Sequence, residues 1–163
     1  MTIDDLNYLD PAAAEAAFVR CCGSTAWARA MAEARPFASL QAMADAADTI
    51  WRSLAPSDWL EAFAAHPKIG ERSRTSSWSD REQTGMQSAD DDVRRRLASG
   101  NATYASRFGY IFIVCAAGKT AAEMLTALET RLSNDPAEEL QVAQEEQRKI
   151  TRLRLAKLID GPS

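Results

Sequence analysis

The amino-acid sequence predicts an all-α fold: a single compact domain of about six to eight helices over residues 1–163, with a long C-terminal helix. Apolar residues recur at helical spacing along most of the chain, and capping residues, glycines and prolines separate these stretches. Residues 110–117 alone have a strand-like composition, and one such segment cannot form a sheet. With 163 residues, 46% hydrophobic and 26% charged, the chain has the size and composition of one globular domain.

Four helices are expected in the first half of the chain. We place them over residues 11–22, 26–34, 39–54 and 56–66. Gly23 closes the first helix just past its end, and either Ser24 or Thr25 can cap the second. The third helix carries apolar residues at helical spacing from Leu40 to Leu54.

The fourth helix leads to the only histidine of the sequence. Pro56 starts this helix, and Ser57 is its expected cap. The residue before a proline is pushed out of the α region, so the helix should end at His66, which precedes Pro67. Residues 67–78 are dense in turn-forming residues and predict a loop. The ring of His66 is therefore expected at a helix end, where it can face a cleft.

A fifth helix is expected to begin at a capping box, Ser79 to Glu82, and to continue to Phe108. Three aspartates at 90–92 lie four residues before three arginines at 94–96. Residues four apart lie on the same side of a helix, so this charge block favours a solvated helix face with i,i+4 pairs.

Two further helices complete the expected fold after the strand-like segment, which Gly118 ends. The first runs from Thr120 to Leu132 and has a capping box with Glu123. The last and longest starts at Asp135-Pro136, where Glu138 completes another box. Its packed side is expected to carry Leu140, Ala143, Ile150, Leu153 and Leu158.

Composition also limits which classes of binding partner and which cellular compartment we expect for this protein. The formal net charge of −4 argues against a surface built for nucleic acid or an anionic membrane, so local arginines would have to bind any anionic ligand. The longest apolar run, 110–117, is far too short to span a bilayer. Three cysteines without ligand spacing indicate a reducing compartment. Neither a secretory pattern nor a peroxisomal signal is seen at the ends, and we expect a cytoplasmic protein.

Few side chains in the sequence are candidates for catalysis or for binding a metal or cofactor. The sequence has no glycine-rich phosphate loop, so nucleotide use is not expected, and one histidine with scattered cysteines makes a zinc site improbable. A Cys/His hydrolase would need His66 to meet Cys115 or the Cys21-Cys22 pair. That is the weaker hypothesis, because buried thiols are usually inert. His66 with carboxylates and arginines remains as the candidate chemistry.

Two charged positions allow more than one interpretation. Glu82 can be a capping-box residue, or it can pair with His66 to give a base whose tautomer is fixed. Arg152 and Arg154 can be surface charges near a helix C-terminus. Arg154, however, stands between Leu153 and Leu155, where a charge favours an anionic partner.

Several short motifs lie along the chain in a characteristic order and spacing. They are His66-Pro67-Lys68-Ile69-Gly70, Trp78-Ser79, Glu82-Gln83-Thr84-Gly85, Tyr104, Phe108-Gly109-Tyr110, Phe112-Ile113-Val114-Cys115, Lys149-Ile150 and Leu153-Arg154-Leu155. Each motif alone is weak, and their combination is specific. Together they resemble the ureidoimidazoline (OHCU) decarboxylase family, and the resemblance extends from about Phe18 to Ile159, nearly the whole chain.

The resemblance implies a fold, a reaction and a set of site residues. Members of this family are all-helical homodimers of urate degradation. Without a cofactor, they remove CO2 from the small-molecule substrate 2-oxo-4-hydroxy-4-carboxy-5-ureidoimidazoline to give (S)-allantoin. By this resemblance His66 is catalytic, Glu82 is its acidic partner, and Arg154 binds an anionic group, with Arg152 as the alternative. The remaining substrate-binding residues would be Pro67, Ser79, Asp80, Arg81, Gln83, Phe112, Ile113, Val114, Cys115 and Ala116.

Some relatives are fused to a hydroxyisourate hydrolase or carry a peroxisomal signal. This sequence shows neither, so we expect a free-standing enzyme of bacterial type. Two other functions stay open: a helical interaction module that uses the loop 67–78, and an enzyme of the same fold acting on a different ureido or imidazolinone acid. Replacement of His66 should not affect an interaction module.

Overall fold

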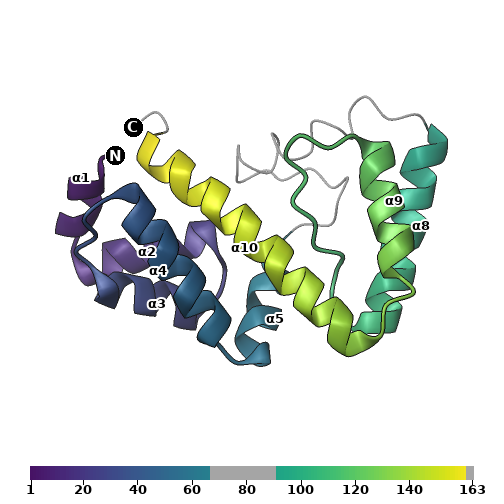
Figure 1. The fold of residues 1–163 in the computed structure, drawn as a ribbon, viewed down its shortest axis with the longest axis horizontal. Helices are drawn as coiled ribbons and strands as arrows, with labels where there is room; N and C mark the ends of the chain where they lie inside the picture. The colour runs from purple at the N-terminus through teal and green to yellow at the C-terminus, as the bar shows by residue number, and fades with distance from the viewer. Residues whose placement is uncertain (67–90, 161–163) are drawn as a thin grey trace. The chain divides into compact units, whose positions relative to one another are not determined.

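The structure is a computed structural model and describes residues 1–66 and 91–160. These residues form eight helices and no strand, which confirms the all-α prediction for them (Figure 1). The helices are α1 Ile3–Tyr8, α2 Pro11–Cys21, α3 Thr25–Ala34, α4 Leu40–Ser53, α5 Pro56–Ala64, α8 Asp91–Phe108, α9 Ala121–Arg131 and α10 Pro136–Asp160. None of the helices described is long and apolar enough to cross a membrane.

The chain divides into two units. The first unit comprises Met1–Ala65 with Arg148–Ser163, and the second comprises His66–Gln147. The expected loop at 67–78 and the capping box from Ser79 to Glu82 lie outside the described residues.

The helix starts of the first unit follow local capping chemistry. Ser24 caps α3 by accepting a hydrogen bond from the Trp27 N–H, which decides between Ser24 and Thr25. Ser39 caps α4 in the same way. The helix α5 begins at Pro56 as expected, but the prediction that Ser57 caps it was wrong, because Ala55 is the N-cap and Ser57 already lies within the first turn. Proline suits this first position, since its missing N–H would have no helical partner there.

The helix α1 was not expected from the sequence. A capping box between Thr2 and Asp5 starts it, and it contains only six residues. Asn7 exchanges two hydrogen bonds with the backbone of Phe37. The Arg35 guanidinium also donates to the carbonyls of Leu6 and, at 2.7 Å, Leu9. Contacts with residues about 30 positions away therefore hold this short helix, and local propensity does not reveal them.

Aromatic side chains fill the core of the first unit, where α3 packs against α2, α4 and α5. Phe18 and Trp27 meet edge to face with ring centroids 5.9 Å apart. The indole N–H of Trp27 donates to the Ala47 carbonyl at 3.2 Å, and that of Trp59 to the Trp51 carbonyl at 2.9 Å. Each of these buried polar atoms thus has a partner, as a stable core requires.

The second unit contains α8 and α9, which pack side by side (Figure 1). Gly100 lies within α8. A Cβ at this position would lie 2.6 Å from Leu128 Cδ2, so the glycine allows the close approach of the two helices. Asp92 forms the expected i,i+4 pair with Arg96 at 3.9 Å on the exposed face.

The strand-like segment 110–117 forms no strand. It is irregular chain between α8 and α9. Gly109 and Gly118 border it with φ values of 85° and 75°, a region that glycine adopts without steric cost. The residues described include no second strand for it to pair with. β-Branched composition therefore indicated a strand that these residues do not form.

The last helix, α10, begins at Pro136 as expected, and the Asp135 side chain accepts a hydrogen bond from the Glu138 N–H. The prediction of its packed side was wrong for Leu153, whose side chain is 44% exposed. Leu155, two positions on, is fully buried instead. Several polar residues share the buried side: Glu139, Gln144, Glu146, Gln147 and Thr151.

Candidate functional site

The predicted site residues fall into three groups. His66 and the segment 112–116 belong to the second unit, and Arg154 belongs to the first. The remaining predicted residues lie outside the described part of the chain: Pro67, Ser79, Asp80, Arg81, Glu82 and Gln83.

His66 is the first residue of the second unit and is half-buried. The helix α5 ends at Ala64, with Ala65 as its C-cap, so the helix stops two residues before the predicted end. The Nε2 atom of His66 lies 2.5 Å from Oε1 of Gln147. An amide oxygen only accepts hydrogen bonds, so this contact calls for a proton on Nε2. In a neutral ring the lone pair is then on Nδ1.

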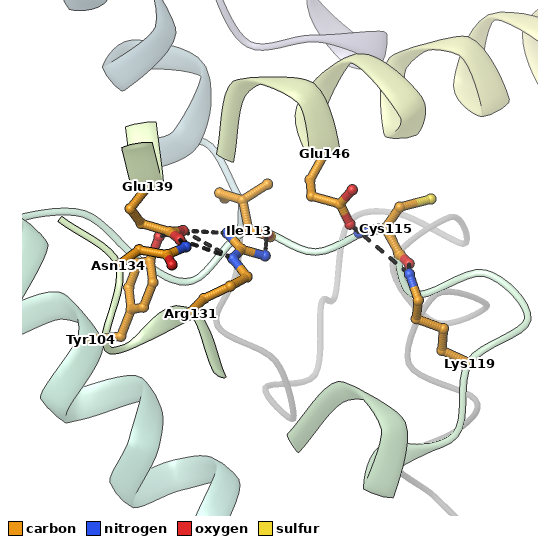
Figure 2. Close-up of polar contacts among 8 residues, drawn as sticks. All are labelled: Tyr104, Ile113, Cys115, Lys119, Arg131, Asn134, Glu139 and Glu146. Atoms are coloured by element: carbon orange, nitrogen blue, oxygen red, sulfur yellow. Dashed lines mark hydrogen bonds and ion pairs between the residues drawn. The ribbon is translucent and has the colours of Figure 1, made fainter. Parts of the chain in front are cut away.

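Side chains hold the segment 112–116 by its backbone, as Figure 2 shows. Arg131 Nη1 donates to the Ile113 carbonyl at 2.7 Å. The Cys115 N–H donates to Glu146 Oε1 at 3.1 Å, and the Cys115 carbonyl accepts from Lys119 Nζ at 3.2 Å. These bonds satisfy backbone groups that would otherwise pair within a sheet or with water. These side chains thus hold the segment in place, although it pairs with no strand among the described residues.

The support behind this segment is a buried polar network (Figure 2). Glu139 is fully buried and accepts from Arg131 Nη2 at 2.6 Å and Nε at 3.0 Å. Asn134 Nδ2 donates to the same carboxylate at 3.1 Å, and the Tyr104 hydroxyl also donates to it. Burial, with the hydrogen bond to Glu139, raises the pKa of Tyr104 well above its usual range. The phenol therefore stays protonated and acts as a donor.

Arg131 connects this network to the candidate binding segment. Its guanidinium lies 4.5 Å from the centroid of the Phe112 ring, in addition to bonding the Ile113 carbonyl and Glu139. A planar guanidinium can form such a stack and a two-point carboxylate contact at once, whereas an ammonium cannot. Arg131 and Glu139 did not emerge as site residues from the sequence.

Two consecutive residues of α10 contact the predicted site residues that are described in the second unit, which are His66 and the segment 112–116. Gln147 contacts His66, and Glu146 bonds the backbone of Cys115. Sequence reasoning missed both. One signal for Gln147 was present, because it lies four residues after Ala143 and three before Ile150, on the buried side of the helix. A polar residue at a core position of an amphipathic helix calls for a partner.

Arg152 and Arg154 lie in different surroundings within the first unit. Arg152 Nη1 is 2.6 Å from Asp48 Oδ2, and Arg148 Nη1 is 3.3 Å from the same oxygen. The charge of Arg152 is therefore already compensated. Arg154 is half-buried on the same helix, before the fully buried Leu155.

The cysteines of the first unit are poor nucleophiles. Burial raises the pKa of Cys21 to about 12 and that of Cys22 to about 11, although the charge of Arg154 acts in the opposite direction. Thiolate is the reactive form, so both thiols are inert near neutral pH. This does not support the Cys/His hydrolase hypothesis for this pair. Within the described residues, no group of three or more His, Cys, Asp or Glu side chains could hold a metal ion.

Comparison with known proteins shows the family to which this chain belongs. The model of the OHCU decarboxylase family matches residues 7–156. The Arabidopsis thaliana protein called uric acid degradation bifunctional protein TTL is 42% identical over 145 residues, or 85% of this chain. This chain spans only 45% of that longer protein. The 2-oxo-4-hydroxy-4-carboxy-5-ureidoimidazoline decarboxylase of Amia calva is 32% identical over 142 residues, which cover 83% of this chain and 81% of that protein.

A solved structure agrees with these relatives. The crystal structure of an OHCU decarboxylase in the presence of (S)-allantoin matches with a TM-score of 0.79 and 41% sequence identity. The match covers 87% of this chain and 96% of that one. On the extent of the family match and the identity to these relatives, the chain belongs to the OHCU decarboxylase family.

Proposed function

We propose that this protein decarboxylates 2-oxo-4-hydroxy-4-carboxy-5-ureidoimidazoline to (S)-allantoin in urate degradation. The observation that carries the proposal is the family match over residues 7–156. The similar structure determined in the presence of (S)-allantoin, with a TM-score of 0.79, supports the same substrate class.

The chemistry of the substrate is compatible with residues of this kind. The substrate carries its carboxylate on a carbon next to a ring C=N group. When the bond to the carboxylate breaks, CO2 leaves and the electron pair moves into the C=N group, whose nitrogen takes a proton. Loss of the hydroxyl proton and protonation of the adjacent carbon on one face then give (S)-allantoin. The substrate supplies its own electron sink, which in other decarboxylations is the task of a cofactor.

In this proposal the side chains handle protons and orient the substrate. His66, with Glu82 as its acidic partner, performs the proton transfers, because a histidine changes charge near neutral pH. Arg154 binds the carboxylate in a bidentate manner. The proposed segment 112–116, with Gln83 and the remaining predicted residues, orients the ring and the ureido group. The bonds from Arg131 and Glu146 support this role, since they hold the segment in one conformation.

A coupled assay tests the function. Urate would be converted by urate oxidase and hydroxyisourate hydrolase, while circular dichroism follows optically active allantoin. We expect fast formation of (S)-allantoin with the wild type and only the slow, racemic product with His66→Asn, with unchanged far-UV spectra. If the wild type also gave only the racemic product, the function would be a different ureido acid reaction or partner binding. Full activity of His66→Asn would exclude the proton-transfer role.

Glu82 needs a separate experiment, because a capping residue and a catalytic partner predict different losses. As a cap alone, Glu82→Gln should lower the free energy of unfolding by at most about 1 kcal/mol and keep its activity. In our proposal activity is abolished in a protein that still unfolds cooperatively.

We also propose a cytoplasmic homodimer, on the strength of the family resemblance. Light scattering on the purified protein should give twice the chain mass of 17.8 kDa. A mass of one chain at micromolar concentration would contradict the dimer.

A further inference from the structure

We propose that Lys119 is a positioning residue for binding of the anionic substrate. It holds the carbonyl of Cys115 and places a positive charge beside Glu146, which bonds the N–H of the same cysteine. Together the two side chains fix the segment 112–116 and keep its surroundings from repelling an anion. The kinetic effect of Lys119 rests on the proposed function, whereas its contacts at Cys115 do not depend on a substrate.

Oppositely charged side chains hold both backbone polar groups of Cys115 (Figure 2). The Cys115 N–H donates to Glu146 Oε1 at 3.1 Å, and the Cys115 carbonyl accepts from Lys119 Nζ at 3.2 Å. The ammonium nitrogen also lies 4.0 Å from Glu146 Oε1, so the two side chains form an ion pair. Hydrogen bonds with an ionised partner are stronger than bonds between neutral groups. All three residues belong to the second unit.

The backbone around Lys119 returns its side chain to the segment. Gly118 has a φ of 75°, which glycine adopts without steric cost, and the Lys119 N–H donates to the Ala116 carbonyl at 3.0 Å. The next residue, Thr120, is the N-cap of α9. The lysine is therefore held between a closed turn and a capped helix, and its ammonium group contacts the carbonyl of Cys115, four residues earlier.

The charge of Lys119 has a further effect, because Glu146 is only 8% exposed and bonds a segment proposed to bind an anion. At an effective dielectric constant of about 20, two like unit charges about 12 Å apart repel enough to weaken binding about tenfold. A positive charge beside the carboxylate offsets this repulsion. The same arrangement occurs at Ile113, whose carbonyl is bonded by Arg131 in an ion pair with Glu139. The segment is thus held by charged side chains that come in balanced pairs.

Steady-state kinetics at pH 8 and low ionic strength test the role of Lys119. Lys119→Met removes the charge and the donor, and we expect KM to rise about tenfold. Added salt should reduce this rise, because it screens the repulsion between charges. Lys119→Arg, which keeps a charge and a donor, should stay near the wild-type KM. Adding Glu146→Gln to Lys119→Met should recover most of the loss, since it removes the negative charge and keeps an acceptor for the Cys115 N–H.

Arg96→Met is the matched control. It also removes one positive charge from the second unit, but exposed Arg96 bonds Glu129 at 3.0 Å, outside the segment. Its KM should equal that of the wild type. An equal rise for Arg96→Met, or a wild-type KM for Lys119→Met, would overturn the proposal. A rise that neither salt nor Glu146→Gln reduces would also overturn it, because it would reflect a structural loss without the effect of charge.

Hydrogen exchange tests the contacts at Cys115 without substrate. In protein labelled with ¹⁵N at cysteine, we expect the Cys115 amide to exchange slowly, although the residue belongs to no helix or strand. Fast exchange in the wild type would overturn the proposal even if no variant folded. A wild type with a protected Cys115 amide but without decarboxylase activity would contradict the proposed function alone.

Discussion

Arg152 and Arg154 lie two residues apart on α10, and their surroundings suggest different tasks. Arg152 forms an ion pair with Asp48 at 2.6 Å and is partly exposed. Arg154 precedes the buried Leu155, and its charge is felt by the buried thiols of Cys21 and Cys22. These surroundings favour a structural role for Arg152, while the family motif favours a substrate role for Arg154.

The two arginines give the first prediction. Arg154→Gln should raise KM about tenfold or more, because hydrogen bonds to a charged group are worth about 1.5–3 kcal/mol. Arg152→Gln should leave KM within about twofold and lower the free energy of unfolding by at most about 1 kcal/mol, as expected for a partly exposed ion pair. Steady-state kinetics and urea unfolding of both variants measure these effects. The opposite pattern would assign the substrate anion to Arg152.

At the scale of elements, the segment 110–117 depends on its side-chain supports. Arg131 bonds Glu139 and the Ile113 carbonyl with one guanidinium. A lysine would retain the charge but not the fork that reaches both groups. The conformation of the proposed binding segment is therefore coupled to the buried ion pair.

Arg131→Lys tests this coupling. We expect the free energy of unfolding to fall by about 1–3 kcal/mol, since buried hydrogen bonds are lost, and KM to rise as the segment loosens. Urea unfolding and steady-state kinetics measure the two effects. Arg107→Lys is the control, because exposed Arg107 donates to the Asn134 carbonyl at 2.8 Å and its loss should cost less than about 0.5 kcal/mol. A fully stable Arg131→Lys variant with wild-type KM would contradict the supporting role.

A second element-scale prediction concerns Gly23, between α2 and α3. A Cβ on Gly23 would lie 2.5 Å from the Cβ of Ala65, the C-cap of α5. A methyl group has no rotamer to relieve this clash, so Gly23→Ala should destabilise the protein by about 1–3 kcal/mol. Adding Ala65→Gly should recover part of the loss. Urea unfolding of both single variants and the double variant gives the coupling, and strictly additive losses would show that the clash is not the cause.

For the whole molecule, the buried thiols predict how stability depends on pH. Free thiols titrate near pH 9, whereas burial raises the pKa of Cys21 to about 12 and that of Cys22 to about 11. The folded protein thus holds these protons more tightly than the unfolded chain. Stability is unaffected below about pH 9 and falls as the pH rises from there toward 11–12. Burial raises the pKa of Tyr104 and of Tyr110 as well, which adds loss in the same direction above about pH 10.

This prediction can be measured by urea unfolding at pH 8, 9 and 10. Each thiol should contribute up to about 1.4 kcal/mol per pH unit above pH 9. The Cys21→Ala/Cys22→Ala double variant should be less stable at pH 8 but should lose less stability between pH 8 and pH 10 than the wild type. An identical loss in both proteins would show that the thiols are not responsible.

The sequence alone determined the helical class, most helix starts and the family. Capping is local: Ser24, Ser39 and the Thr120–Glu123 box act on backbone groups within three residues, so their pattern is visible in the chain itself. The motif around His66 likewise identified the family that the comparisons show. The single histidine also directed attention to the candidate site before any contact was known.

Only the tertiary structure decided what these residues contact. It showed that 110–117 is irregular chain that forms no strand within the described residues, that Leu153 is exposed, and that Arg131 supports Ile113. It also placed Gln147 against His66, 81 positions apart in the chain. The physical reason is that burial and hydrogen bonding between distant segments depend on packing, and neither periodicity nor local capping specifies which distant residue fills a given place.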